Sequence, residues 1–138
     1  MAEIKVEITK DNSKQVLNDL NKATDNALTA IGIAAVSYAA RITPVDTGLA
    51  RNSITYALHG KPAAQQAYSD NSHGQSGAYK GNAEDKKNTV YIGSNVQYFP
   101  ILEDGGNGRI GFHMLRKAVT EHSDEYKKLV EKYLKQEG

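Results

Sequence analysis

Apolar residues alternate with polar ones at the start of the chain and then change to helical spacing. Ile4, Val6 and Ile8 alternate with charged or polar residues, which is the period of a strand with one buried face. Asp11-Asn12-Ser13 follow with short side chains that are typical of helix N-caps. Apolar side chains then recur at spacings of four and seven, which predicts one long amphipathic helix ending near residue 42. The positions are Val16, Leu20, Ala27, Ile31, Tyr38 and Ile42. The second half of the helix, residues 30–40, is almost entirely small or apolar, so we expect it to pack on a sheet or on a neighbouring subunit.

A sharp corner is predicted where this helix ends. Pro44 disfavours helix at the residue before it and supplies no backbone N–H. Asp46 can hydrogen-bond to the backbone two residues on, and Gly48 can adopt a positive φ. We therefore interpret Pro44, Asp46, Thr47 and Gly48 as a structural corner between helix and sheet. Ser53 and Ile54 begin a second predicted strand, in which the apolar residues alternate with polar or small ones up to residue 58.

The segment 59–87 differs in kind from the rest of the chain. Its 29 residues include four Gly and one Pro and contain no Leu, Ile, Val, Phe or Met. Such a composition buries too little apolar surface to offset the entropy lost on ordering. We predict a long flexible loop that orders on assembly. Tyr68 and Tyr79 are its two large aromatic side chains, and tyrosine favours protein–protein interfaces, so we interpret them as possible partner contacts; two tyrosines in a mobile loop without a function fit equally well.

The remaining elements complete an α+β pattern. Residues 89–93 read as a strand, residues 96–98 as a short extended piece, and Pro100 begins a single helical turn. A flexible connection over residues 105–108 precedes a closing helix from about Phe112 to Lys135. We predict one domain over residues 1–138, in which an antiparallel sheet of three to four strands packs against two long helices. If the strands that flank it pair antiparallel, the loop 59–87 forms the tip of a large hairpin.

Composition narrows the classes of function. Seventeen basic residues against sixteen acidic ones give a net charge of +1, which offers no global field toward nucleic acid or an anionic membrane. The chain has no Cys, which excludes disulfides, thiolate metal sites and Cys nucleophiles. No apolar run approaches the roughly 20 residues of a membrane span. We expect a soluble protein made in a cytoplasm, without a signal peptide.

Asp46-Thr47-Gly48 also permits a catalytic interpretation. Asp-Thr-Gly carries the active carboxylate of aspartic proteases, which share a proton between two such groups, so a chain of this size would act as a homodimer. Residues 90–93 resemble the segment that supports the catalytic loop in retroviral-type proteases. The context argues against this hypothesis, because a helix ending in Thr-Pro precedes the motif and Leu49 stands where a small residue is expected. We keep the protease as the alternative.

Other candidate motifs lack the context that their chemistry needs. Residues 106–111 spell Gly-x-Gly-x-x-Gly, but they do not connect a parallel strand to a helix, so a flexible linker is the better interpretation and no cofactor is predicted. The four histidines show no zinc-binding spacing, and we predict no metal site. The basic residues Lys86, Lys87, Arg109, Arg116 and Lys117 define a third possibility, a nucleic-acid-binding module, which the balanced charge disfavours.

Two blocks of sequence together resemble a known family. The first runs from Thr43 to Ile54 and reads Thr-Pro-Val-Asp-Thr-Gly-Leu-Ala-Arg-Asn-Ser-Ile. The second runs from Val90 to Gly106 and contains Gly-Ser-Asn-Val-Gln-Tyr followed by Glu-Asp-Gly-Gly. This pattern is similar to that of the small tail-component proteins of long-tailed bacteriophages, called minor tail, neck, tail-completion or head–tail joining proteins. The matching positions are Arg51, Ser53, Ile54, Gly93, Asn95, Tyr98, Glu103 and Gly105.

The resemblance covers about two-thirds of the chain and implies a virion protein without catalytic activity. Such a subunit assembles with itself as a ring, expected to be a hexamer, between the head connector and the tail tube. The implied partners are the tail-tube protein and the connector or adaptor proteins, with no membrane and no sequence-specific nucleic acid. The implied location is the neck or tail of the virion, after assembly in the host cytoplasm. Ala50 and residues 103–106 depart from the usual pattern, but neither departure concerns chemistry.

Overall fold

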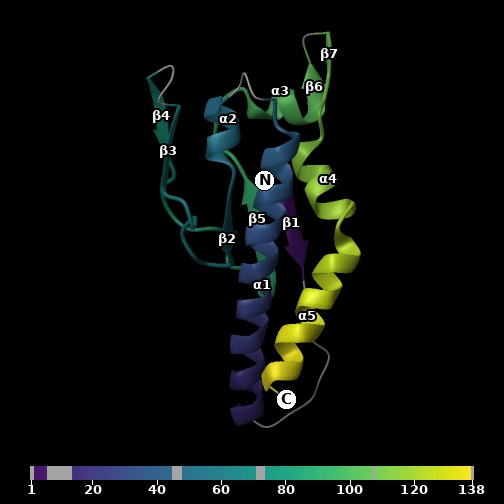
Figure 1. The fold of residues 1–138 in the computed structure, drawn as a ribbon. Helices are drawn as coiled ribbons and strands as arrows, with labels where there is room; N and C mark the ends of the chain where they lie inside the picture. Colours follow the sequence, from purple (N-terminus) through teal and green to yellow (C-terminus); the bar gives the residue numbers. More distant parts are fainter. Residues whose placement is uncertain (1, 6–13, 45–47, 71–73, 107, 138) are drawn as a thin grey trace.

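The chain folds into short antiparallel sheets with helices packed along them. The computed structural model describes residues 2–5, 14–44, 48–70, 74–106 and 108–137. The predicted α+β class is confirmed in this coarse form (Figure 1). In chain order the elements are β1 (Ala2–Lys5), α1 (Lys14–Ile42), α2 (Gly48–Ser53), β2 (Thr55–Leu58), β3 (Ala67–Asp70), β4 (Gln75–Ala78), β5 (Thr89–Gly93), α3 (Phe99–Asp104), β6 (Gly105–Gly106), β7 (Arg109–Ile110), α4 (Met114–Thr120) and α5 (Ser123–Glu137).

The main sheet has three strands in the order β1-β5-β2, and both pairings are antiparallel. The central strand β5 is buried at every position. Tyr56 lies opposite Ile92, and Leu58 lies opposite Val90, so these side chains share one face of the sheet. The predicted antiparallel pairing of the strands that flank residues 59–87 is confirmed.

Helix α1 covers this face and contributes Leu28, Ile31, Ala35 and Ala39 to the core. Leu28 and Ile31 are fully buried in the same cluster as Val90 and Ile92. A Cβ added at Gly32 would lie 2.7 Å from the ring of Tyr56, so the glycine allows the helix to approach the sheet closely. The helix ends at Ile42, as predicted from the proline that follows. Its small residues therefore pack on the chain's own sheet, which is one of the two expected outcomes.

The opposite face of the sheet is covered by the chain that returns to β5. Tyr91 points to this face because side chains alternate along a strand, and it is only 8% exposed. The charges of Glu84 and Lys86 lie close enough to act on its hydroxyl. Lys86 Nζ also lies 3.0 Å from Glu3 Oε1 on β1. Glu84 and Lys86 thus lie beside Tyr91 on the second face of the sheet.

The closing helix is broken, contrary to the prediction of one continuous helix from Phe112 to Lys135. Helix α4 ends at Thr120 and α5 begins at Ser123. The break lets the buried Tyr126 donate its hydroxyl hydrogen to Ala118 O, which a straight helix would not expose. Both helices pack along α1 (Figure 1). The apolar pattern runs through the break, and Ser123 followed by two acidic residues was the available signal of a new helix start.

Four shorter elements also differ from the prediction. Helix α2 stands where the corner was expected to lead directly into a strand, and its six residues are too few to show a period. Residues 96–98 lead into α3 instead of forming an extended piece, and residues 105–110 form the β6–β7 hairpin instead of a plain linker. Within residues 59–87, β3 and β4 form an antiparallel hairpin that the sequence analysis did not predict, and the predicted flexibility of this segment stays a prediction.

Candidate functional site

The two sequence blocks meet where α2 and β5 both end. Ser53 Oγ donates to Ala50 O at 2.6 Å, which closes α2, and the same oxygen contacts Ser94 Oγ just beyond β5. Ser94 Oγ in turn accepts from the backbone N–H of Val96 at 3.1 Å. The predicted residues Ser53, Gly93 and Asn95 are therefore brought together. We call the motif junction the set Ser53, Gly93, Ser94 and Asn95 with Tyr68 and Tyr79.

The hydroxyl of Tyr79 joins both blocks. It donates to Ser53 O at 2.5 Å, lies 3.3 Å from Gly93 O, and accepts from the backbone N–H of Asn95 at 3.2 Å. Asn95 Nδ2 donates to Ala78 O at 2.9 Å. The side chain of Tyr79, on the hairpin side, and the side chain of Asn95, beyond β5, therefore tie the β3–β4 hairpin to the end of the main sheet.

Tyr68 adds a second anchor to the same hairpin. Its hydroxyl donates to Asn95 Oδ1, and its ring packs tilted against Tyr79 with the ring centroids 5.5 Å apart. Gly77 lies opposite Tyr68 in the hairpin, and a Cβ there would overlap the tyrosine ring. These contacts explain why a polar segment carries two tyrosines. Their predicted contact with a partner stays a prediction.

Burial raises the pKa of the Tyr79 hydroxyl, and burial also raises the pKa of the Tyr68 hydroxyl. Both hydroxyls are therefore neutral donors throughout the neutral pH range. Among the described residues, neither Ser53 nor Ser94 has a histidine, lysine or carboxylate as hydrogen-bond partner. A serine nucleophile needs such a base, so the motif junction has the chemistry of a structural joint.

Glu103 organises the other end of the second block. Its Oε1 accepts from the backbone N–H of Leu115 at 2.7 Å, and its Oε2 accepts from that of Arg116 at 3.0 Å. These donors belong to the first turn of α4, where backbone N–H groups have no helical partner. The chain between them is held by Phe112 N–H donating to Leu102 O at 2.7 Å. Glu103 thus fixes α4 relative to α3 and closes the loop that carries β6 and β7.

The same region contains the one group of potential metal ligands found among the described residues. Ligand atoms of Glu103, Asp104 and His113 lie within 4.8 Å of one another. Carboxylate and imidazole are suitable ligands for Zn²⁺ or Mn²⁺. Both oxygens of Glu103 already accept backbone N–H groups of α4, however, so capping accounts for this carboxylate. The predicted absence of a metal stays a prediction.

The other predicted residues have separate positions. Asp46 and Thr47 lie outside the described residues, and Pro44 lies two residues beyond the end of α1 at Ile42. Gly48 begins α2 without the predicted positive φ; a Cβ there would lie 3.0 Å from Asp70 Oδ2, so space and not backbone conformation favours glycine. Arg51 is partly exposed on α2, and Tyr98 is half-buried before α3. Ile54 is a core residue at 3% exposure.

An apolar surface that the sequence did not predict lies on the β6–β7 hairpin and the adjoining helix. Four large hydrophobic side chains are exposed among the described residues, and three of them are here. Ile110 is 90% exposed, Phe112 45% and Ile101 37%. We call these three residues the apolar tip. The three residues lie within twelve positions of the chain, and exposed apolar side chains that gather on a surface are typical of interaction sites.

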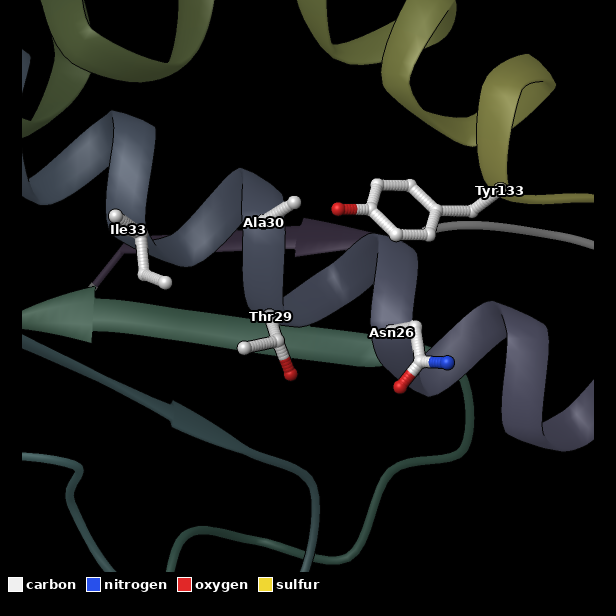
Figure 2. A pocket seen from close by; sticks show the side chains of 5 residues that line it. All are labelled: Asn26, Thr29, Ala30, Ile33 and Tyr133. Atoms are coloured by element: carbon white, nitrogen blue, oxygen red, sulfur yellow. The ribbon is translucent and has the colours of Figure 1, made fainter.

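A shallow hollow of about 390 Å³ lies between α1 and α5 (Figure 2). Asn26, Thr29, Ala30 and Ile33 line it from α1, and Tyr133 reaches over it from α5. Apart from the Tyr133 phenol, its lining has no titratable side chain. The hollow therefore offers packing and hydrogen bonding and no acid–base pair.

The basic residues considered for nucleic-acid binding come from three different parts of the fold. Lys86 is paired with Glu3 beside the sheet. Arg109 is exposed on β7, and Arg116 and Lys117 are exposed on α4. Lys87 is exposed just before β5.

Two further findings concern membranes and relatives. None of the described helices is long and apolar enough to cross a membrane. Comparison with protein-family models, with curated proteins and with solved structures finds no match.

Proposed function

We propose that this chain is a structural adaptor of a long-tailed bacteriophage, a tail-completion or head–tail joining subunit. It assembles with itself into a ring between the head connector and the tail tube, with six subunits as the expected number. The proposal rests on the resemblance of the two sequence blocks and on the role that their residues have in the fold.

The observation that carries the proposal is the use of the motif residues as joints. Ser53, Gly93 and Asn95 tie the β3–β4 hairpin to the main sheet, and Glu103 ties the β6–β7 region to α4. A catalytic motif would instead converge reactive groups on a shared point. A rigid body with two attached hairpins is suited to a subunit that meets neighbours on several sides.

The apolar tip is the surface that we assign to these contacts. Ile110 is 90% exposed, and burial of its side chain against another surface is energetically favourable. The tip is formed by a hairpin of two-residue strands, which leaves its side chains accessible to a neighbouring subunit or to the tail tube. A ring of identical subunits is built from head-to-tail contacts, so each copy needs two complementary surfaces, and we assign the apolar tip to one of them.

The test compares matched variants of exposed apolar residues. Mass photometry and negative-stain images of the purified chain, alone and with its cognate tail tubes and connector, measure ring formation and binding. We expect closed rings or tube-end binding for the wild type, loss of both for the double variant Ile110→Ser/Phe112→Ser, and no loss for Ile33→Ser, which removes an exposed isoleucine from α1. A wild-type chain that stays monomeric with every partner would refute the adaptor function. Rings that persist in the double variant would refute only the role of the tip.

The alternative, a homodimeric aspartic protease using Asp46, is tested separately. The described elements on either side of residues 45–47 are helices, whereas the protease motif follows a buried strand in an all-β body. Peptide cleavage at acid pH is measured for the wild type and for Asp46→Asn. Cleavage that disappears in the variant alone would replace the adaptor proposal.

A further inference from the structure

His59 lies between two carboxylates at the base of the segment that carries β3 and β4. It directly follows β2, and its Nε2 lies 3.3 Å from Asp25 Oδ1 on α1. Its Nδ1 lies 3.2 Å from Asp85 Oδ1 on the returning chain. The imidazole is 21% exposed, against 49% for Asp25 and 81% for Asp85. One side chain therefore joins α1, β2 and the return to β5.

The protonation state of the imidazole decides whether both contacts are hydrogen bonds. A neutral imidazole has one N–H and one lone pair, and an ionised carboxylate only accepts. In the neutral form, one ring nitrogen therefore directs its lone pair at a carboxylate oxygen. The imidazolium donates from both nitrogens, and each bond is then assisted by opposite charge.

We propose that His59, Asp25 and Asp85 form a proton-dependent clasp, closed when His59 is protonated and loosened when it is neutral. Histidine is the side chain that changes charge between pH 5 and 8. The clasp is fully formed when the imidazole is protonated and loses one of its two contacts when the imidazole is neutral. It goes beyond the proposed adaptor function and does not depend on it.

The groups around the clasp restrict its effect to the base of the segment. Asp25 from α1 and Asp85 from the return are the charged groups that contact the imidazole among the described residues. Glu84 contributes its backbone carbonyl, which accepts from Gly60 N–H at 3.2 Å, and His59 N–H donates to Thr89 O at 3.1 Å. These backbone bonds do not titrate, but they open more often when the base has one contact fewer with its neighbours. What changes with pH is the attachment of this base to α1 and the position of Asp85.

The second anchor of the segment does not respond in the same range. Tyr79 and Tyr68 hold the β3–β4 hairpin through neutral hydroxyls whose pKa values are raised by burial. The segment thus has one attachment that depends on the protonation of an imidazole and one that depends on neutral hydroxyls. Loosening the clasp leaves the hairpin attached at the motif junction and frees its base.

Hydrogen exchange of the full-length protein tests the clasp. Exchange of the amides in residues 59–61 and 83–86 is measured at pH 5.5 and pH 8.0 and divided by the intrinsic rate at each pH. We expect protection about two- to five-fold lower at pH 8.0, the size that a partly exposed ion pair supports. Residues 89–93 of the central strand serve as the internal reference and keep the same protection.

Three variants identify the groups responsible. His59→Gln should remove the pH dependence, because glutamine has no titrating group. Asp25→Asn should remove it as well, because the asparagine amide can donate a hydrogen bond to the neutral ring nitrogen of His59. His122→Gln, which removes another histidine beside a carboxylate, should leave it unchanged. A wild-type protein with equal corrected protection at both pH values overturns the proposal. A pH dependence that survives in folded His59→Gln or in Asp25→Asn also overturns it.

Discussion

The two hairpins outside the main sheet are attached to the same body by opposite means. Figure 1 shows them projecting at one end of the molecule, with α2 and α3 between them. The β3–β4 hairpin has four-residue strands and is held by side-chain hydroxyls of Tyr68 and Tyr79. The β6–β7 hairpin has two-residue strands and is held by glycine geometry and by the carboxylate of Glu103.

The means of attachment determines what each hairpin leaves on its surface. An isolated two-stranded hairpin is at best marginally stable in water, so each needs an anchor to the body. The first hairpin turns its aromatic side chains inward as that anchor and exposes polar residues. The second is anchored through backbone and carboxylate groups, so its apolar side chains stay exposed. Tyr68 and Tyr79 are therefore used for contacts within the chain, whereas the apolar tip is left uncovered, and the predicted partner contact of the tyrosines stays a prediction.

The largest expected effect comes from the glycine that shapes the second hairpin. Gly105 has φ +89° and ψ 175°, a region that only glycine occupies readily, and a Cβ there would lie 2.7 Å from Arg109 O. We expect Gly105→Ala to lower the free energy of unfolding by about 3 kcal/mol, measured by urea denaturation.

Gly108 provides the matched control for this substitution. It also has a positive φ, +79°, but an added Cβ meets nothing within 4 Å. Gly108→Ala should cost about 1 kcal/mol, from backbone conformation alone. Equal losses of stability for Gly105→Ala and Gly108→Ala would show that the hairpin opens to relieve the overlap between the new Cβ at position 105 and Arg109 O.

Removal of the Glu103 carboxylate should have the next largest effect. Glu103→Ala leaves two backbone N–H groups of α4 without their acceptors, and loss of a helix cap costs about 1–2 kcal/mol. Asp104→Ala is the control, because that neighbouring carboxylate is exposed and caps no helix among the described contacts. Urea denaturation of both variants checks the difference. Equal stability of Glu103→Ala and Asp104→Ala would contradict the capping role.

The parts of the fold that could be predicted from the sequence are those with a repeating pattern of apolar residues. Helix α1 and the strands β2 and β5 have long or regular patterns, and proline marks the end of α1. Helix α2 and the β6–β7 hairpin are too short for a period to appear. The break before Ser123 was obscured because the apolar positions on both sides continue one helical pattern.

The hairpin within residues 59–87 was not predicted, because composition measures apolar area and does not record specific polar contacts. Its order depends on Tyr68, Tyr79 and Gly77. The contacts of these residues form only in the folded chain, where the hairpin packs against Asn95. That the motif residues mark a known family stays a prediction. Their roles as joints could not be predicted, since a hydrogen bond between residues 53 and 94 leaves no local pattern in the sequence.

A smaller effect should separate the two tyrosine anchors of the first hairpin. Tyr79→Phe removes a half-buried hydroxyl that contacts both sequence blocks, and we expect a loss of about 1–1.5 kcal/mol. Tyr68→Phe removes one bond to an exposed asparagine and should cost about 0.5 kcal/mol. Chemical denaturation measures both values. A larger cost for Tyr68→Phe would mean that Tyr68, and not Tyr79, is the main anchor of the hairpin.

The smallest effect is confined to alkaline pH. Burial raises the pKa of Tyr79 above its ordinary value of about 10, so the folded protein binds this proton more tightly than the unfolded chain. Its contribution is complete below about pH 10 and is lost as the pH rises toward the folded-state pKa, with a slope of at most about 1.4 kcal/mol per pH unit. Urea denaturation between pH 9 and 11 should therefore show a shallower fall in stability for Tyr79→Phe than for the wild type, while absorbance at 295 nm follows tyrosine ionisation. Identical slopes for the two proteins would mean that the hydroxyl is solvated in the folded state, and the first hairpin would then be held by packing of its rings and not by hydrogen bonds at the motif junction.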